Sequence, residues 1–302
     1  MASNSERLNI DKEKYSTISY SQYSLYNKCQ YRWYLDYVKK LKKPEHTIDL
    51  TFGTSFHESF QNYLEVLYTQ SEKEANKIDF ADDLTKRMCE NYAKNIQELN
   101  GTHYTTKEIF QEYINDGVTI LEWIRKRRSA YFRLKGYSLV GIEVPLQIPV
   151  SEERPNVLMV GFIDLVLKNE QTGKYYVLDI KTSRQGWKDK DKKDQVKVNQ
   201  VLFYKKFYSQ LLNVSEDMIE VSFFIVRRKL YENSEFPIKR VQEFVPTQGK
   251  IKVKQAIEGL NSFVNEAFTP EGKPVEKQYP KDTSNCKYCP YKNRPDICSK
   301  TN

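Results

Sequence analysis

The sequence has no hydrophobic run long enough to cross a membrane. Its first residues, MASNSERLNIDKEKYS, are polar and lack the apolar stretch of a signal peptide. We therefore expect a cytoplasmic protein that has no membrane partner. The chain also has no internal repeat and no long low-complexity linker, so its 302 residues suit one large domain or two small ones.

Cysteine is scarce, with five residues at positions 29, 89, 286, 289 and 298. An odd number in a cytoplasmic chain argues against a disulfide scaffold. Three of the five stand near the C-terminus in CKYCPYKNRPDIC, where eight residues separate the second from the third. Such crowding is typical of a metal or cluster site, because thiolates must converge on one centre. A tetrahedral site needs a fourth ligand, for which Cys29 and Cys89 are the candidates.

The excess of positive charge is modest, since 48 basic and 40 acidic residues give a net charge of +8. By itself this indicates a polyanionic partner only weakly. Basic residues do cluster, however, at 39–43, 125–128 and 188–197. Any one of these runs is most often a solvated surface. Three of them in a chain with a candidate catalytic site favour nucleic acid as the partner.

Apolar periodicity predicts helices in the first part of the chain and a mixture of strands and helices afterwards. A tyrosine-rich helix is predicted to begin after Ser19, which is a plausible N-cap. The other predicted helices are 54–69, 79–98, 106–133, 195–212 and 248–268. The predicted strands are 137–149, 157–167, 175–182, 219–226 and 239–245. The order αβββαβ indicates an α/β core with helices on its faces.

The same pattern suggests how the chain is divided. We expect residues 1–17 to be disordered and residues 18–302 to form a single domain. Within that domain, a helical insertion is expected at about 70–136. A C-terminal metal or cluster segment is expected at 270–302.

Polar residues stand among the apolar ones of three consecutive predicted strands. Asp164 and Asp179 lie in the two strands of a hairpin, and Glu143 lies on the strand before it. Lys181 is two residues after Asp179, so the two side chains point to the same face. Since neighbouring strands are about 4.8 Å apart, facing acids can converge on one cation such as Mg²⁺. The alternative is that the acids stand at strand ends or pair with the lysine.

The helix after this hairpin adds two more polar side chains. Gln200 and Tyr204 are four residues apart and therefore share a face. Because the helix directly follows the Lys181 strand, it can pack on the sheet and hold both groups over a metal. Beside such a cation, the lysine can orient a water and offset charge that builds on a phosphate. Without the hairpin, the pair would indicate only a half-buried helix face.

These residues resemble the motifs of a known family, the RecB-like branch of the PD-(D/E)XK nucleases. The likeness is to its cysteine-rich members, which include CRISPR-associated exonucleases, AddB-type repair nucleases and related phage proteins. The family's G-x-x-x-H helix is matched by Gly53 to His57, and its G-x-x-D strand by Gly161 to Asp164. Its D-x-K-T strand is matched by Asp179 to Thr182, and its Q-x-x-x-Y helix by Gln200 to Tyr204. The resemblance covers residues 18 to 298 in the family's order.

The resemblance implies roles for these residues. His57, Asp164, Asp179 and the carbonyl of Ile180 would ligate Mg²⁺ or Mn²⁺. Lys181 would position the attacking water or stabilise the transition state, and Gln200 and Tyr204 would contact the substrate near the scissile phosphate. Glu143 is a possible additional acid, because some members have one on the preceding strand. The simpler interpretations are a surface strand residue for Glu143 and a helix-face histidine for His57.

The resemblance also suggests a use for the cysteines. In cysteine-rich members, one N-terminal and three C-terminal cysteines hold a [4Fe–4S] cluster, which Cys29, Cys286, Cys289 and Cys298 would do here. The site would tie the chain ends together and stabilise the fold by closing a long loop. Family members typically have about five residues before the last cysteine, whereas this chain has eight. Zn²⁺ on the same thiolates is therefore the alternative. Cys89 is expected to be a small buried hydrophobe.

The basic loop 184–197 leads from the Lys181 strand to the Gln200 helix. Its lysines are suited to follow a phosphate backbone, and Trp187 is suited to stack on a base. The helical insertion would form a wall beside the site that admits a single strand. The candidate DNA-binding residues of the loop are Arg184, Trp187, Lys188, Lys190, Lys192 and Lys193.

The function predicted from these features is a metal-dependent DNA nuclease. We expect a single-strand exonuclease or end-processing enzyme that carries a structural [4Fe–4S] cluster. One alternative is a catalytically silent DNA-binding or assembly subunit of a recombination complex. Another is a four-cysteine zinc interaction module. No helicase motif is present, so a helicase or recombination partner would be a separate chain. The expected location is the bacterial cytoplasm, or the cytoplasm of the host if a phage encodes the protein.

Overall fold

The structure, a computed structural model, describes residues 8–132, 135–231 and 238–298. Its internal contacts divide the chain into two compact units. Unit 1 comprises Met1–Lys43, Pro145–Phe162 and Lys250–Asn302, and unit 2 comprises Pro44–Val144 and Ile163–Gly249. The sequence had suggested a single domain over residues 18–302.

Unit 2 contains most of the mixed sheet. β3 (Val157–Asn169) and β4 (Tyr175–Ser183) form the predicted antiparallel hairpin. β5 (Ile219–Arg227) pairs with β4 in parallel, and β6 (Val241–Phe244) pairs with β5 in antiparallel. β2 (Tyr137–Pro149) pairs with β3. This is the α/β arrangement that the sequence predicted.

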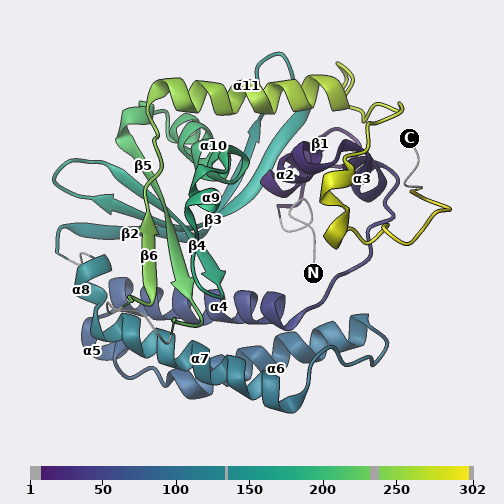
Figure 1. Cartoon of the computed structure of the whole chain (residues 1–302). Coiled ribbons are helices and arrows are strands. Elements are labelled where there is room, and N and C mark those ends of the chain that lie inside the picture. The colour runs from purple at the N-terminus through teal and green to yellow at the C-terminus, as the bar shows by residue number, and fades with distance from the viewer. Residues whose placement is uncertain (1–7, 133–134, 232–237, 299–302) are drawn as a thin grey trace. The chain divides into compact units, whose positions relative to one another are not determined.

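Helices cover both faces of this part of the sheet. α10 (Gln195–Leu211) packs on β4 and β5, while α4 (Ile48–Thr69) contacts β4 and lies apart from α10 (Figure 1). Successive side chains of β4 point to opposite faces of the sheet, and Leu178 and Ile180 point to the core that α4 covers. Asp179 and Lys181 therefore point to the face on which α10 packs. The short helix α9 (Asp189–Lys193) precedes α10, and the 3₁₀ turn η2 (Glu216–Met218) follows it.

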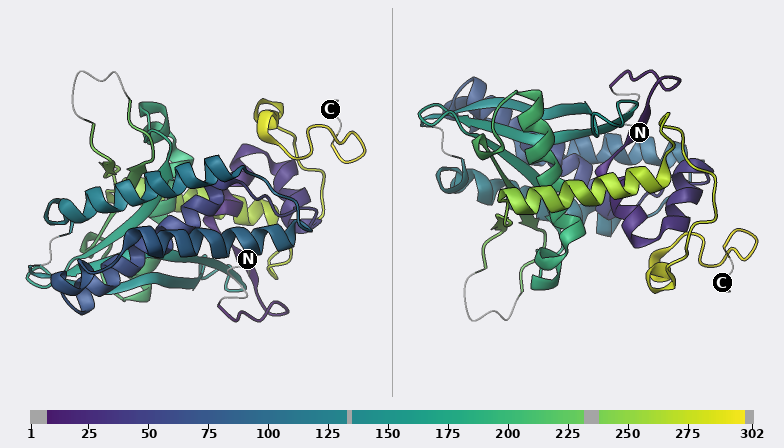
Figure 2. Two further views of the ribbon diagram at one scale, coloured as in Figure 1. Left: turned by 90° about the horizontal axis from the view of Figure 1, so that it is seen from below. Right: turned by 90° about the horizontal axis from the view of Figure 1, so that it is seen from above.

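The predicted helical insertion is a layer against α4. It consists of α5 (Glu72–Ala75), α6 (Phe80–Glu98), α7 (Lys107–Lys126) and α8 (Arg128–Tyr131). Figure 2 shows α6 and α7 side by side. At Gly117 of α7, an added Cβ would collide with Leu84 of α6 and would lie 2.9 Å from Phe52 of α4. The glycine therefore permits the close approach of the three helices.

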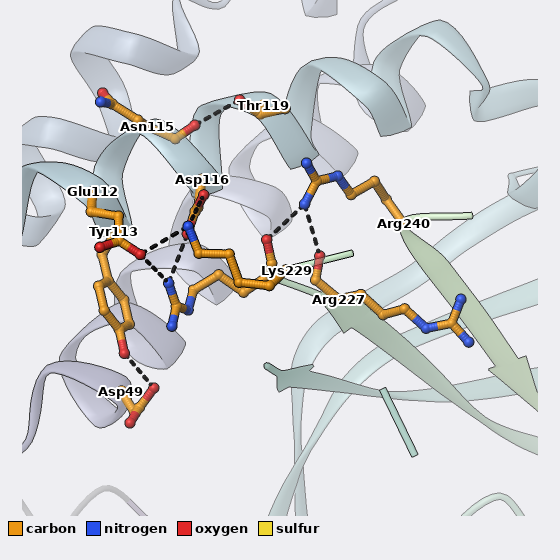
Figure 3. A network of polar contacts seen from close by, with 10 residues as sticks. Asp49, Glu112, Tyr113, Asn115, Asp116, Thr119, Arg227, Lys229 and Arg240 are labelled. Carbon is orange, nitrogen blue, oxygen red and sulfur yellow. Dashed lines mark hydrogen bonds and ion pairs between the residues drawn. The ribbon is translucent and has the colours of Figure 1, made fainter. Parts of the chain in front are cut away.

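Charged side chains also join this layer to the sheet. Arg228 and Lys229 follow β5 directly, and both form ion pairs with Glu112 and Asp116 of α7 (Figure 3). The Arg228 guanidinium lies 3.8 Å from the centre of the Tyr113 ring. Only 8% of Arg228 is exposed, so this network fixes α7 beside the end of β5.

Unit 1 is built around aromatic side chains. Its described helical elements are α2 (Tyr20–Lys28), α3 (Gln30–Trp33), the π-helical turn η1 (Tyr34–Val38), α11 (Lys250–Ala267) and the 3₁₀ helix η3 (Thr283–Tyr288). α11 runs beside α2 (Figure 2), and the ring of Phe263 contacts those of Tyr26 and Trp33. Ser19 caps α2 as predicted, since its hydroxyl accepts a hydrogen bond from the Gln22 N–H.

The prediction of a disordered N-terminus differs from the structure at residues 8–17. β1 (Ser16–Ile18) pairs in parallel with the start of β3, and Ile10 is buried against Leu158 and Val160. These apolar contacts and ladder bonds order a segment whose polar composition had suggested disorder. Residues 1–7 lie outside the described part of the chain. Among the helices that the structure describes, none combines the length and apolar character needed to cross a bilayer.

Candidate active site

The hairpin opens where its two acids stand. The antiparallel pairing of β3 and β4 includes Leu165↔Leu178, and the next residues along the two strands are Asp164 and Asp179. Here the Ile180 N–H donates to Asp164 Oδ2 at 2.6 Å, so a side chain takes the place of a ladder carbonyl. On its other side β4 stays paired with β5 through this region. The opening therefore exposes one edge of β4 without breaking the sheet.

Asp179 is the most deeply placed acid of the site. Its side chain is only 2% exposed, and the Lys181 ammonium lies 2.8 Å from its Oδ2. Besides this contact with Lys181, no hydrogen bond of acceptable geometry reaches the oxygen from the described residues. A buried carboxylate oxygen with only an ion pair is costly, which is expected where a further cation completes its surroundings.

His57 of α4 reaches the opened edge of the hairpin. Its Nδ1 lies 3.8 Å from Asp164 Oδ1, and the Ile180 backbone is close enough to raise the pKa of the imidazole. Burial lowers the pKa of His57 to about 4, with the positive charge of Lys181 acting in the same direction. The imidazole is therefore neutral at neutral pH, which is the form that binds metals.

The carboxyls respond to burial in the opposite way. Burial raises the pKa of Asp164 to about 6, against the lowering effects of Lys181 and the Ile180 N–H. Burial likewise raises the pKa of Asp179 to about 6, although Lys181 opposes it. For Lys181, burial alone would lower the pKa, but Asp179 and Asp164 outweigh it and raise the pKa. Such opposed shifts in one cluster are typical of functional sites.

α10 supplies the two residues predicted from its sequence. Gln200 and Tyr204 are buried, and the Gln200 amide donates to the Tyr204 hydroxyl at 3.1 Å. Burial holds the pKa of Tyr204 well above its usual value, and the charges of Asp179 and Asp164 add to this. The hydroxyl therefore stays protonated beside the acids and remains able to donate a hydrogen bond.

Glu143 also lies in this cluster, and it has a companion that the sequence analysis missed. Gln61 of α4 donates through Nε2 to Glu143 Oε1 at 3.0 Å and to the Asp164 carbonyl at 3.4 Å. The charge of Glu143 raises the pKa of both His57 and Asp164. Gln61 is one helical turn after His57, and that spacing is the signal that could have identified it.

The donor chemistry of the cluster fits a divalent cation. Two carboxylates, a neutral imidazole and the Ile180 carbonyl are ligands that Mg²⁺ and Mn²⁺ accept. The poorly bonded oxygen of Asp179 fits the same interpretation. However, no group of three or more His, Cys, Asp and Glu side chains in the described residues is arranged to hold a metal ion.

The basic segment after β4 differs in part from its prediction. Arg184, Lys188, Lys190 and Lys193 are exposed, whereas Lys192 lies 3.7 Å from Asp189. The Trp187 ring packs against Phe223 and Phe244, and the Lys197 ammonium lies over it. These contacts give the half-buried Trp187 ring a packing role, and its stacking on a base stays a prediction.

In unit 1, four cysteines line one cavity of about 210 Å³. They are Cys29, Cys286, Cys289 and Cys298. Their mutual proximity is also evident in the pKa of Cys298, which burial raises and to which the other three thiols contribute. Asn285 fixes the C-terminal loop on the first helices, because its amide donates to the Lys28 carbonyl at 2.9 Å.

The fifth cysteine corrects a prediction. Cys89 of α6 is exposed, although we expected it to be buried. The neighbouring Met88 is fully buried, and a rotation of one residue along a helix turns Cys89 away from that core.

A comparison with protein families agrees with this site. The family model of the PD-(D/E)XK nuclease superfamily matches residues 17–296. Among curated proteins, none matches this chain in sequence. The family match spans nearly the whole chain and includes the hairpin acids, Lys181, His57 and the pair on α10. The chain therefore belongs to the PD-(D/E)XK nuclease superfamily.

Proposed function

We propose that this nuclease hydrolyses DNA phosphodiester bonds at the β3–β4 opening with Mg²⁺ or Mn²⁺, acting on single-stranded ends. The observation that carries the proposal is the buried Asp179 carboxylate, which stands at the opened edge next to Asp164 and 2.8 Å from the Lys181 ammonium. A catalytically silent protein would have no use for two acids with raised pKa values in this position.

The residues that would hold the cation are His57, Asp164, Asp179 and the Ile180 carbonyl. When bound, a divalent cation polarises a phosphate and lowers the pKa of a water. Glu143 would add negative charge beside these ligands.

The remaining residues act on the substrate itself. The Lys181 ammonium would orient the attacking water or stabilise charge on the phosphate, since its pKa is raised and it stays protonated. The Tyr204 hydroxyl and the Gln200 amide would donate hydrogen bonds near the scissile phosphate. Their mutual hydrogen bond fixes both side chains before substrate arrives.

The proposed substrate is supported by the segment between β4 and α10. Four exposed basic side chains follow Lys181 within twelve residues and are suited to contact a phosphate backbone: Arg184, Lys188, Lys190 and Lys193. The helical layer of α6 and α7 would serve as the wall that favours a single strand. Unwinding of duplex DNA would fall to a separate helicase or recombination protein.

For unit 1 we propose a structural [4Fe–4S] cluster on the four cysteines of the cavity. Their convergence from both chain ends supports this role. The eight-residue spacing before Cys298 leaves Zn²⁺ as the competing occupant.

The test of the nuclease is degradation of end-labelled single-stranded DNA with Mn²⁺ or Mg²⁺. We compare the wild-type chain with Lys181→Ala and with Lys168→Ala, a lysine on the other strand of the hairpin. Circular single-stranded DNA and blunt duplex serve as competing substrates. We expect the wild type and Lys168→Ala to degrade linear single strands, and Lys181→Ala to lose cleavage about 100-fold while still binding DNA.

Other results would change the proposal in defined ways. Cleavage of the circular substrate would replace exonuclease with endonuclease activity. Equal cleavage by Lys181→Ala would place the chemistry elsewhere. A wild-type chain that binds DNA but cuts nothing with either metal would support a silent DNA-binding subunit.

A further inference from the structure

Glu143 has an unusual backbone for a residue inside a strand. Its φ of +49° lies in the left-handed region, although it stands in the middle of β2. A residue with a side chain is strained there and keeps the conformation only if its surroundings enforce it. Such a residue interrupts the alternation of a strand and redirects its side chain. In this chain the carboxylate is directed towards His57 and Asp164, whose pKa values it raises.

Gln61 is the side chain that meets this carboxylate. Its amide donates to Glu143 Oε1 at 3.0 Å and to the Asp164 carbonyl at 3.4 Å. One side-chain amide therefore bridges β2 and β3 from the helix that carries His57. Gln61 is only 7% exposed. If its amide is removed, water can therefore hardly replace the hydrogen bonds that it donates to these two acceptors.

The chemistry of position 61 demands an amide. The NH₂ group supplies two hydrogens, which match the two acceptors on the neighbouring strands. A glutamate there would place a second carboxylate against Glu143, and a methionine would fill the space but donate nothing.

We propose that Gln61 is a positioning residue of the active site, which holds the Glu143 carboxylate and the Asp164 strand in register with His57. The proposal rests on the proposed nuclease function, because the groups that Gln61 aligns are those assigned to the cation and the phosphate. Gln61 is not among the residues proposed to hold the cation or to contact the phosphate, so its effect would pass through Glu143 and Asp164.

The test compares Gln61→Met, Gln61→Glu, Glu143→Gln and the double variant Gln61→Glu/Glu143→Gln. Gln97→Glu on the exposed surface of α6 is the matched control. The readouts are the Mn²⁺ concentration for half-maximal cleavage, kcat, direct Mn²⁺ binding without DNA, and thermal denaturation without metal.

We expect Gln61→Met and Gln61→Glu to raise the half-maximal Mn²⁺ concentration about ten-fold or more, as outer-shell changes at metal sites do. Gln97→Glu should match the wild type. When position 143 is already glutamine, Gln61→Glu should change the Mn²⁺ dependence and the melting temperature much less, because no second carboxylate then faces position 61. The two substitutions are therefore expected to be non-additive in both metal dependence and melting temperature.

Two results would overturn the positioning role. One is a Gln61→Met variant with unchanged Mn²⁺ dependence, which would reduce Gln61 to packing. The other is strict additivity of Gln61→Glu and Glu143→Gln. If the wild type neither cleaves nor binds Mn²⁺, the nuclease proposal fails. The melting temperatures of the same four variants still decide whether Gln61 and Glu143 are coupled.

Discussion

At the scale of single residues, burial disfavours the charged forms of the acids and the histidine in the site. The two hairpin acids have pKa values raised to about 6, and the pKa of His57 is lowered to about 4. Each shift favours the neutral form in the metal-free chain. A bound cation would reverse this preference for the acids while accepting the neutral imidazole. Without a cation, the charged forms of the two acids therefore lower the stability of the fold.

This cost predicts the behaviour of Asp164→Asn. Cleavage should be lost, yet the metal-free variant should melt at the wild-type temperature or above it. An acid whose folded pKa of about 6 exceeds its unfolded value opposes folding increasingly as the pH rises from about 4 through 6. The stability advantage of the variant should therefore be larger at pH 7.5 than at pH 4. The asparagine oxygen can still accept from the Ile180 N–H.

Thermal denaturation in EDTA at the two pH values checks this prediction. Asp189→Asn, which changes a side chain that is 86% exposed, is the control and should show no such trend. A variant that melts several degrees below the wild type at pH 7.5 would mean that Asp164 stabilises the fold as a carboxylate.

Tyr204→Phe tests the role of the protonated hydroxyl. We expect kcat to fall about ten-fold or more with little change in KM, because a hydrogen-bond donor near the reacting phosphate is removed. Tyr208→Phe is the matched control, since Tyr208 is one turn later on α10, is equally buried and packs against Tyr175. Steady-state kinetics on single-stranded DNA separates the two, and equal effects would assign Tyr204 to packing alone.

At the scale of elements, the helical layer is held to the sheet by the charges shown in Figure 3. Arg228→Met should lower the free energy of unfolding by roughly 2 kcal/mol, because it removes a charge-assisted hydrogen bond to Asp116 and the contact with Tyr113. Asp116 keeps its ion pair with Lys229. In an Asp116→Asn background, the same change should cost less.

Urea denaturation measures these differences. Lys77→Gln disrupts an exposed pair with Glu74 and should cost less than about 1 kcal/mol, which makes it the control. Similar small costs for Arg228→Met would show that the layer is held by its apolar contacts alone.

The elements themselves were largely predictable, because periodicity and capping residues are local. Ser19 and Thr106 accept hydrogen bonds from their first helical turns, where the sequence placed the helix starts. The rotation of a helix about its axis depends on tertiary packing, so Cys89 was wrongly expected to be buried. Gln61 was missed although its spacing from His57 places both on one face of α4. Local patterns also do not reveal the left-handed backbone of Glu143.

At the scale of the whole molecule, the two candidate sites belong to different units. The hairpin acids, Lys181, His57 and the α10 pair lie in unit 2, and the four clustered cysteines lie in unit 1. The spacing of the three C-terminal cysteines indicated a common site, but the sequence linked Cys29 to them only through the family resemblance, since thiols separated by more than 250 residues carry no local signal. Their common cavity gives that expectation a physical basis.

This separation predicts different outcomes for cysteine substitutions. Cys29→Ser and Cys298→Ser should each lose the bound metal and lower the melting temperature, because either change opens a ligand set that closes a long loop. Cys89→Ser should keep the metal and the melting temperature of the wild type, since its thiol is exposed on α6.

Metal analysis and visible absorbance after anaerobic purification identify the occupant. An iron content that matches the cluster supports [4Fe–4S], and one zinc ion per chain replaces it with Zn²⁺. If Cys29→Ser keeps its metal, Cys29 is not a ligand, and the site does not close the long loop between the N-terminal and C-terminal segments.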